Sequence, residues 1–105
     1  MGRVLTVARA SVIPEHREQY LGAMAGLAAV VREEGRHCWL FRHPADPGRY
    51  LEFREGPSGG SHPVSGLERD LEARVRDLAT HDADAGVVWE EVTWPEGPGT
   101  NRESD

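Results

Sequence analysis

The chain has 105 residues and a formal net charge of -6, from 18 acidic and 12 basic residues. This length predicts one domain with a single core, and the acidic balance without a basic stripe excludes nucleic acid and anionic membranes as main partners. The single cysteine, Cys38, allows no internal disulfide, and no apolar run approaches the roughly 20 residues that span a bilayer. We therefore expect a cytoplasmic protein without a membrane segment.

The first half of the chain predicts a strand, a helix and a hairpin. Residues 4–13 are rich in β-branched and apolar residues and end at Pro14, which suits the first turn of a helix. Helical spacing of apolar residues then runs from residue 15 to about 34, and Gly35 is a natural stop. The stretches HCWLFRH and RYLEFRE, joined by a Pro-Gly turn, predict a hairpin over residues 37–55.

The second half predicts a loop, a helix and a last strand. The glycine-rich stretch GPSGGSHPVSG is typical of a loop, and Ser65 is suited to cap a helix with Leu67, Leu71, Val75 and Leu78 on one face. The stretch VVWEEVTW, residues 87–94, predicts the fourth strand. The order β-α-β-β-α-β is that of a ferredoxin-like α+β fold with a four-stranded antiparallel sheet. We expect residues 1–95 to form this domain and residues 96–105 to be a disordered tail.

Alternation along the hairpin divides its side chains between the two faces of the sheet. Hydrophobicity alone favours the large apolar side chains as the face that meets the helices: Trp39, Phe41, Leu51 and Phe53. The opposite face would then carry a mixed set, to which the last strand adds Trp89 or its neighbours: Cys38, Leu40, Arg42, Tyr50, Glu52 and Arg54. Because this set is too apolar for water and too charged for a core, we expect it to line a ligand cavity capped by a second subunit.

The opening RVLTVARASVIPEHREQYL and the hairpin FRHPADPGRYLEF resemble the dimeric α+β barrel superfamily, and within it the antibiotic-biosynthesis-monooxygenase-like proteins. The resemblance covers about residues 3–94 and implies a homodimer of ferredoxin-like chains that pack sheet against sheet around small-molecule pockets. Two features depart from the family pattern. The third strand ends in Arg54-Glu55-Gly56 where members commonly carry Glu-x-Trp, and the family's pocket Asn has no counterpart before Asn101.

Several residues are candidates for chemistry, each with a structural alternative. Glu52, flanked by Arg42 and Arg54, is a candidate acid or base, or else part of a cross-strand ion pair. His62, in the glycine-rich loop, is a second candidate base. Tyr50 is a hydrogen-bond donor to substrate or a packing residue.

The remaining candidate residues have simpler structural explanations. Cys38 is more typical of a small buried hydrophobe than of a nucleophile, and Leu40 and Trp89 are candidate wall residues. The turn that contains His81 is explained by solvated turn chemistry. No set of residues has metal-ligand spacing and no glycine loop fits a dinucleotide, so we expect neither a metal nor an organic cofactor.

The leading hypothesis is a cofactor-independent monooxygenase, or related tailoring enzyme, that acts on a small aromatic or polycyclic phenol or hydroquinone. A base, Glu52 or His62, would deprotonate the substrate, and Arg42 or Arg54 would stabilise negative charge. The alternative is a non-catalytic small-molecule-binding or stress-associated barrel protein.

Overall fold

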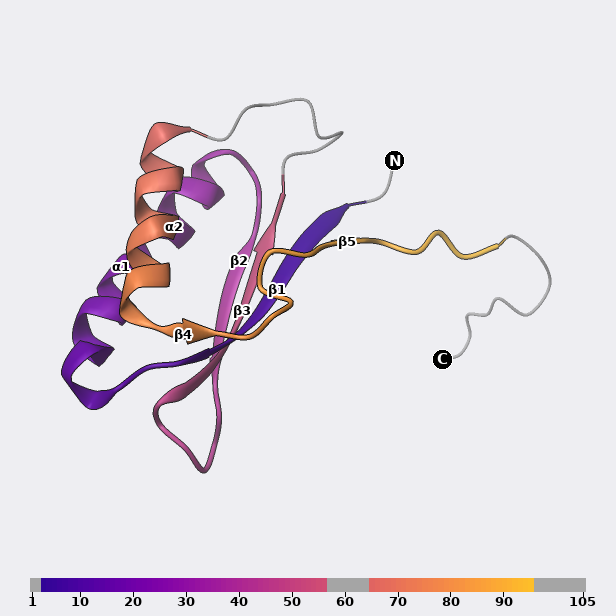
Figure 1. Ribbon diagram of the computed structural model, residues 1–105. Coiled ribbons are helices and arrows are strands. Elements are labelled where there is room, and N and C mark those ends of the chain that lie inside the picture. The colour runs from indigo at the N-terminus through magenta and orange to yellow at the C-terminus, as the bar shows by residue number, and fades with distance from the viewer. Residues whose placement is uncertain (1–2, 57–64, 96–105) are drawn as a thin grey trace.

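The computed structural model describes residues 3–56 and 65–95, which form two helices on one face of an antiparallel sheet (Figure 1). The elements are β1 (Val4–Ser11), a short 3-10 helix (Pro14–His16), α1 (Arg17–Glu33), β2 (Cys38–Arg42), β3 (Arg49–Glu55), α2 (Gly66–Leu78), β4 (Thr80–His81) and β5 (Val88–Glu90). The predicted α+β fold and its order of elements are confirmed. His62 and the predicted tail over residues 96–105 lie outside the described residues. No helix in the described ranges is long and apolar enough to cross a membrane.

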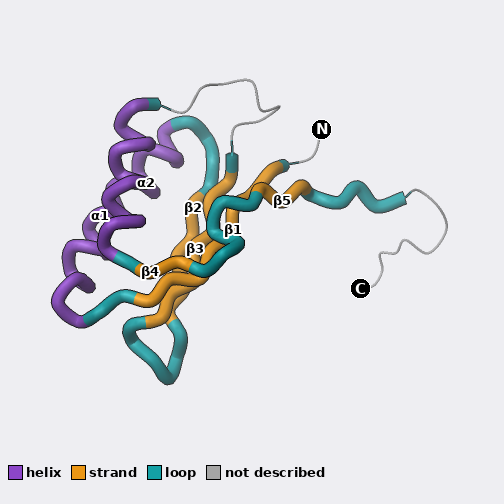
Figure 2. The backbone as a smooth tube through the Cα atoms, viewed as in Figure 1, coloured by secondary structure: helices purple, strands orange, loops and turns teal. Residues whose placement is uncertain are grey.

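The strands lie in the order β2-β3-β1-β4, and β5 also pairs with β1. The long central pairing aligns β1 with β3 from Leu5 opposite Glu55 to Ser11 opposite Arg49. The last strand is shorter than predicted, because β5 ends at Glu90 and, after Glu91 has bonded Arg3, the chain leaves the sheet (Figure 2). A strand that the sequence did not indicate, β4, pairs with the other end of β1.

Local signals fix the ends of both helices. At the end of α1, Gly35 has a φ of 78°, its N–H bonds the carbonyl of Arg32 at 2.9 Å, and the N–H of Arg36 bonds the carbonyl of Val31 at 3.1 Å. This pattern is a Schellman motif, which satisfies carbonyls that the helix leaves free. At the start of α2, the Ser65 hydroxyl accepts a hydrogen bond from the N–H of Glu68 at 3.1 Å.

The core lies between the sheet and the helices. It is built mainly from α1, with smaller contributions from the strands and α2: Ala10, Val12, Tyr20, Ala23, Met24, Leu27, Val31, Tyr50, Val75 and Leu78. A buried ion pair closes one end of this core, because the Arg36 guanidinium bonds Glu68, Glu34 and the carbonyl of Glu55. The guanidinium of Arg36 therefore joins the end of α1, the end of β3 and the first turn of α2.

The predicted orientation of the hairpin is wrong. Tyr50 is buried in the core and Leu40 packs against it, whereas Trp39 and Phe41 are 43% and 55% exposed on the opposite face. The helix-facing side therefore carries the mixed set, and the aromatic side is open. The reason is steric and electrostatic together: β1 presents small alanines beneath the helices, and the helices supply polar partners for Glu52 and Arg54.

The packing of the two helices predicts how truncation of two leucines changes the free energy of unfolding. Leu27→Ala should lower the free energy of unfolding by about 2 to 5 kcal/mol, because Leu27 fills the core between sheet and helices. The matched control is Leu67→Ala on α2, where Leu67 is 59% exposed and the loss should stay within about 0.5 kcal/mol. Urea unfolding of both variants measures the difference, and equal losses would contradict the observed packing.

Candidate active site

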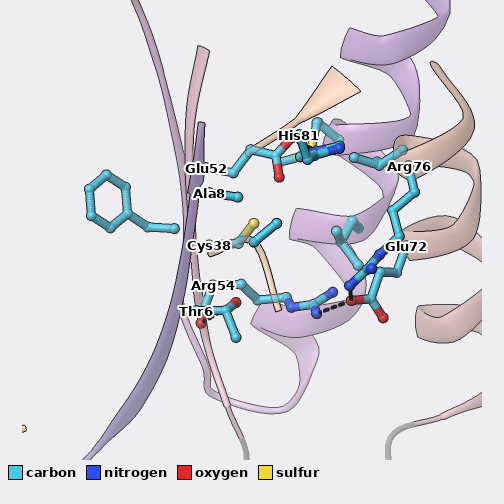
Figure 3. A pocket seen from close by; sticks show the side chains of 13 residues that line it. Thr6, Ala8, Cys38, Glu52, Arg54, Glu72, Arg76 and His81 are labelled. Atoms are coloured by element: carbon cyan, nitrogen blue, oxygen red, sulfur yellow. Dashed lines mark hydrogen bonds and ion pairs between the residues drawn. The ribbon is translucent and has the colours of Figure 1, made fainter. Parts of the chain in front are cut away.

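A small cavity of about 40 Å³ lies between the inner face of the sheet and the helices. Figure 3 shows side chains from β1, β2 and β3 on one side and from α2 on the other, directed into the same space. Met24, Leu27 and Val75 form its apolar part. Its polar lining contains Thr6, Cys38, Glu52, Arg54, Glu72, Arg76 and His81. Ligand pockets combine apolar walls with converging polar groups, and this cavity has both, with polar side chains making up about half of its lining.

Glu52 is the centre of the first polar cluster. Its Oε2 accepts a hydrogen bond from the Tyr20 hydroxyl at 2.6 Å and lies 3.0 Å from Nε2 of His81. The side chains of Glu52 and His81 are only 15% and 12% exposed. Among the described residues, Oε1 of Glu52 receives no hydrogen bond, so one oxygen of this carboxylate remains available to a ligand.

Three different elements bring this cluster together. Glu52 lies on β3 directly opposite Ala8 of β1, and His81 lies on β4 opposite Ala10 of β1, so both point to the same face. Tyr20 reaches down from the first turns of α1, and its ring packs on Tyr50 with centroids 4.9 Å apart. Burial first, and then the hydrogen bond to Glu52, raise the pKa of Tyr20 well above that of a free tyrosine. Tyr20 is therefore a fixed hydrogen-bond donor at neutral pH.

Arg54 and two residues of α2 form the second polar cluster. Oε2 of Glu72 accepts hydrogen bonds from Arg54 at 2.8 Å and from Arg76 at 3.0 Å, and both appear as dashed lines in Figure 3. Burial pushes the pKa of Glu72 upward, but the hydrogen bonds from the two arginines outweigh this effect and lower it overall. The cluster thus ties the sheet to α2 with Glu72 ionised.

Cys38 contributes a thiol and not a thiolate. Burial raises its pKa, and the nearby Arg54 only partly offsets this effect. Because the thiolate is the nucleophilic form, Cys38 is a wall residue at neutral pH.

The predicted site residues separate into three places. Cys38, Glu52 and Arg54 line the cavity, and Leu40 packs beside the core on the same face. Arg42 and Tyr50 border a different hollow near the hairpin turn. Trp89 lies opposite Leu5 on the open face and lines a third hollow with Trp39.

Sequence reasoning gave no role in the site to Tyr20, which bonds Glu52, or to three residues that line the cavity: Glu72, Arg76 and His81. Tyr20 lies within the predicted helix over residues 15–34, and the apolar spacing of that helix does not indicate that its hydroxyl reaches Glu52. His81 was assigned to a turn, although it forms β4 with Thr80 and contacts Glu52. A usable signal was the Glu72–Arg76 spacing, which places both side chains on one face of the helix.

The cavity and the fold together define a ferredoxin-like α+β protein with an acid–base cluster under its helices. Neither a protein-family model nor a curated protein sequence matches the chain. Solved structures do. An antibiotic biosynthesis monooxygenase is similar with a TM-score of 0.64 and 21% identity, over 88% of this chain and 99% of the other.

Two further structures share the fold. Rv0793 from Mycobacterium tuberculosis has a TM-score of 0.64 and 19% identity, over 90% of this chain and 97% of its own. SnoaB from Streptomyces nogalater, a cofactor-independent oxygenase, has a TM-score of 0.62 and 17% identity, over 91% and 97%. The resemblance to the antibiotic-biosynthesis-monooxygenase-like proteins is therefore confirmed for the fold.

The raised pKa of Tyr20 predicts a loss of stability in alkali. An unfolded tyrosine ionises near pH 10 while folded Tyr20 stays protonated, so the unfolded state binds fewer protons there. The free energy of unfolding should therefore fall as the pH rises above about 10. Tyr20→Phe should make this decline shallower, although the variant should be less stable at neutral pH because it loses the bond to Glu52. Urea unfolding over a pH series tests the slope, and an unchanged slope would refute the assignment.

Proposed function

We propose that this chain is a monooxygenase-like enzyme in which Glu52 and His81 act as an acid–base pair. The observation that carries the proposal is the carboxylate of Glu52 in the cavity, with one oxygen held by Tyr20 and His81 and the other without a hydrogen bond among the described residues. A held carboxylate next to an imidazole is the equipment for general acid–base catalysis. The fold of a cofactor-independent oxygenase, shared at 17% identity, supports the class of reaction.

The proposed reaction takes its electrons from the substrate. The pair removes a proton from a phenol, hydroquinone or anthrone-type carbon acid, and the resulting anion reduces dioxygen. For an anthrone, one oxygen atom enters the product as a quinone carbonyl and the other leaves as water, so the substrate supplies all four electrons. Arg54 stabilises negative charge that develops on the ring oxygen. Neither a metal nor an organic cofactor has a role in this scheme.

The size of the cavity limits what it can hold. A volume of about 40 Å³ accommodates a few water molecules, whereas ligand pockets for ring compounds measure roughly 300 to 1,000 Å³. A larger ligand therefore requires side chains of the cavity wall to move. The Arg54–Glu72–Arg76 cluster is the part that can do so, since the side chain of Arg76 is 55% exposed. We propose that a substrate with an anionic oxygen takes the place of Glu72 on Arg54 as it enters.

One observation favours the second candidate, a small-molecule-binding protein without catalysis. Arg54 and Arg76 are both paired with Glu72, so among the described residues neither arginine of the cavity is free for a substrate oxyanion. Turnover separates the two candidates, because a binding protein would hold the phenol and leave it unoxidised.

The proposed role of Glu52 can be tested with a control substitution on the same strand, β3. Glu52→Gln should lower kcat by about 10² to 10⁴ on one-, two- or three-ring phenols and anthrones in air, followed by quinone absorbance. Glu55→Gln is the matched control, because Glu55 lies on β3 but on the open face, where it bonds His37. Equal activity of Glu52→Gln and the wild type would refute the assignment.

Independence of cofactors is tested by comparing the turnover of treated and untreated protein. Turnover after chelation and removal of flavin should equal turnover of the untreated protein. Recovery of a lost activity on adding a metal or flavin would show that the scheme is wrong while the fold stands.

We also propose that the open face of the sheet forms a homodimer. Trp39, Phe41 and Phe53 pack edge to face there with centroid separations of 6.5 and 5.6 Å, and Trp39 and Phe41 remain about half exposed. Exposed aromatic clusters of this kind mark interfaces between protein surfaces. A second copy would cover them by two-fold symmetry.

Light scattering should therefore give about twice the chain mass of 11.6 kDa. Trp39→Asp should yield a monomer, since it places a charge within the aromatic cluster. Leu67→Asp changes a more exposed apolar residue on α2 and should leave the dimer intact. A monomeric wild type would contradict the interface.

A further inference from the structure

A second hollow, of about 300 Å³, lies beside the hairpin that joins β2 and β3. The loop of this hairpin projects beyond the sheet in Figure 2. The residues that shape the hollow include Arg9, Ser11, Phe41, His43, Arg49 and Leu51. It shares no lining residue with the cavity that holds Glu52, so it is a separate candidate site.

The strand register places two arginines together in this hollow. Arg9 lies opposite Leu51 and Ser11 lies opposite Arg49, so all four side chains share the open face and the arginines occupy one diagonal. Diagonal neighbours on paired strands lie about 7 to 8 Å apart, within reach of long side chains. Guanidinium groups of neighbouring long side chains repel each other where they approach, and an anion bound between them removes this repulsion.

The described part of the chain offers these arginines little neutralisation. Asp82 is 3.8 Å from Arg9, whose side chain is 74% exposed, and none of the described ion pairs includes Arg49. No described Asp or Glu lines the hollow. In a protein with a net charge of -6, this local excess of positive charge stands out from its surroundings.

The hollow also has an apolar wall. Phe41 is 55% exposed and pairs across the strands with Leu51, so an aromatic ring and an aliphatic chain lie next to the arginine diagonal. Ser11, which lies opposite Arg49, adds a hydroxyl to the lining of the hollow. Paired guanidinium groups bind phosphate and carboxylate oxygens strongly, and the adjoining apolar wall suits the body of a small organic molecule.

We propose that this hollow binds a small organic anion, with its phosphate or carboxylate between Arg9 and Arg49 and its apolar body against Phe41 and Leu51. The proposal is independent of the chemistry at Glu52. It assigns the chain a second ligand on the open face, at the hairpin end, and requires that the proposed dimer leave this end of the face uncovered.

Calorimetric titration at low ionic strength tests the proposal with inorganic phosphate, phenyl phosphate and benzoate. Phenyl phosphate should bind about tenfold tighter than inorganic phosphate because its ring meets the apolar wall, and added salt should weaken both. Arg9→Gln and Arg49→Gln should each weaken phenyl phosphate about tenfold. Arg74→Gln, on the exposed side of α2 and outside the described ion pairs, should bind as the wild type does.

Each other outcome has a definite meaning. Binding that survives both substitutions, or no binding of any probe, would overturn the proposal. A loss of the dimer in Arg9→Gln or Arg49→Gln without anion binding to the wild type would assign the arginines to contact between copies and would also overturn it. Glu52→Gln should retain binding of phenyl phosphate, which separates this site from the proposed enzyme activity.

Discussion

The structure depends on one constraint: charged side chains on the inner face of the sheet must find partners beneath the helices. An unpaired buried charge costs more than packing recovers, so Glu52 and Arg54 can face inward only if the helices supply matching groups. Tyr20 from α1 meets Glu52, and Glu72 from α2 meets Arg54. The positions of both helices over the sheet are therefore tied to these two residues of β3 as well as to the apolar core.

This constraint also explains the other face. Once the polar side chains turn inward, alternation forces Trp39, Phe41 and Phe53 outward. The protein thus places a polar cluster in its interior and an aromatic cluster on its surface, the reverse of the usual distribution. Such a reversal is stable when the interior groups are paired, and the proposed dimer would in addition cover the exterior aromatic cluster.

The sequence predicted the order of elements well because local signals decide it. Pro14, Gly35 and Ser65 mark boundaries through backbone geometry alone, and the structure places boundaries near all three. The faces of the sheet were predicted wrongly because the residues of the hairpin were ranked by hydrophobicity alone. The first strand held the correcting signal, since Arg9 and Ser11 alternate with Ala8 and Ala10 and show which face is wet. The contact of His81 with Glu52 joins distant segments through β1, and no local pattern encodes it.

Two short strands, β4 and β5, share one edge of β1, and this affects how the chain tolerates insertions and deletions. β4 pairs with Ala10 and Ser11, β5 pairs with Val4 to Thr6, and the turn between them is joined to β1 only around Arg9. Opening of β5 therefore leaves the short pairing that holds His81 against Glu52 in place. Amide exchange along this edge should occur in two separate steps, one for each short strand. Insertions or losses after Ala85 would then alter the C-terminal segment while the acid–base pair stays assembled, so the two parts can diverge separately.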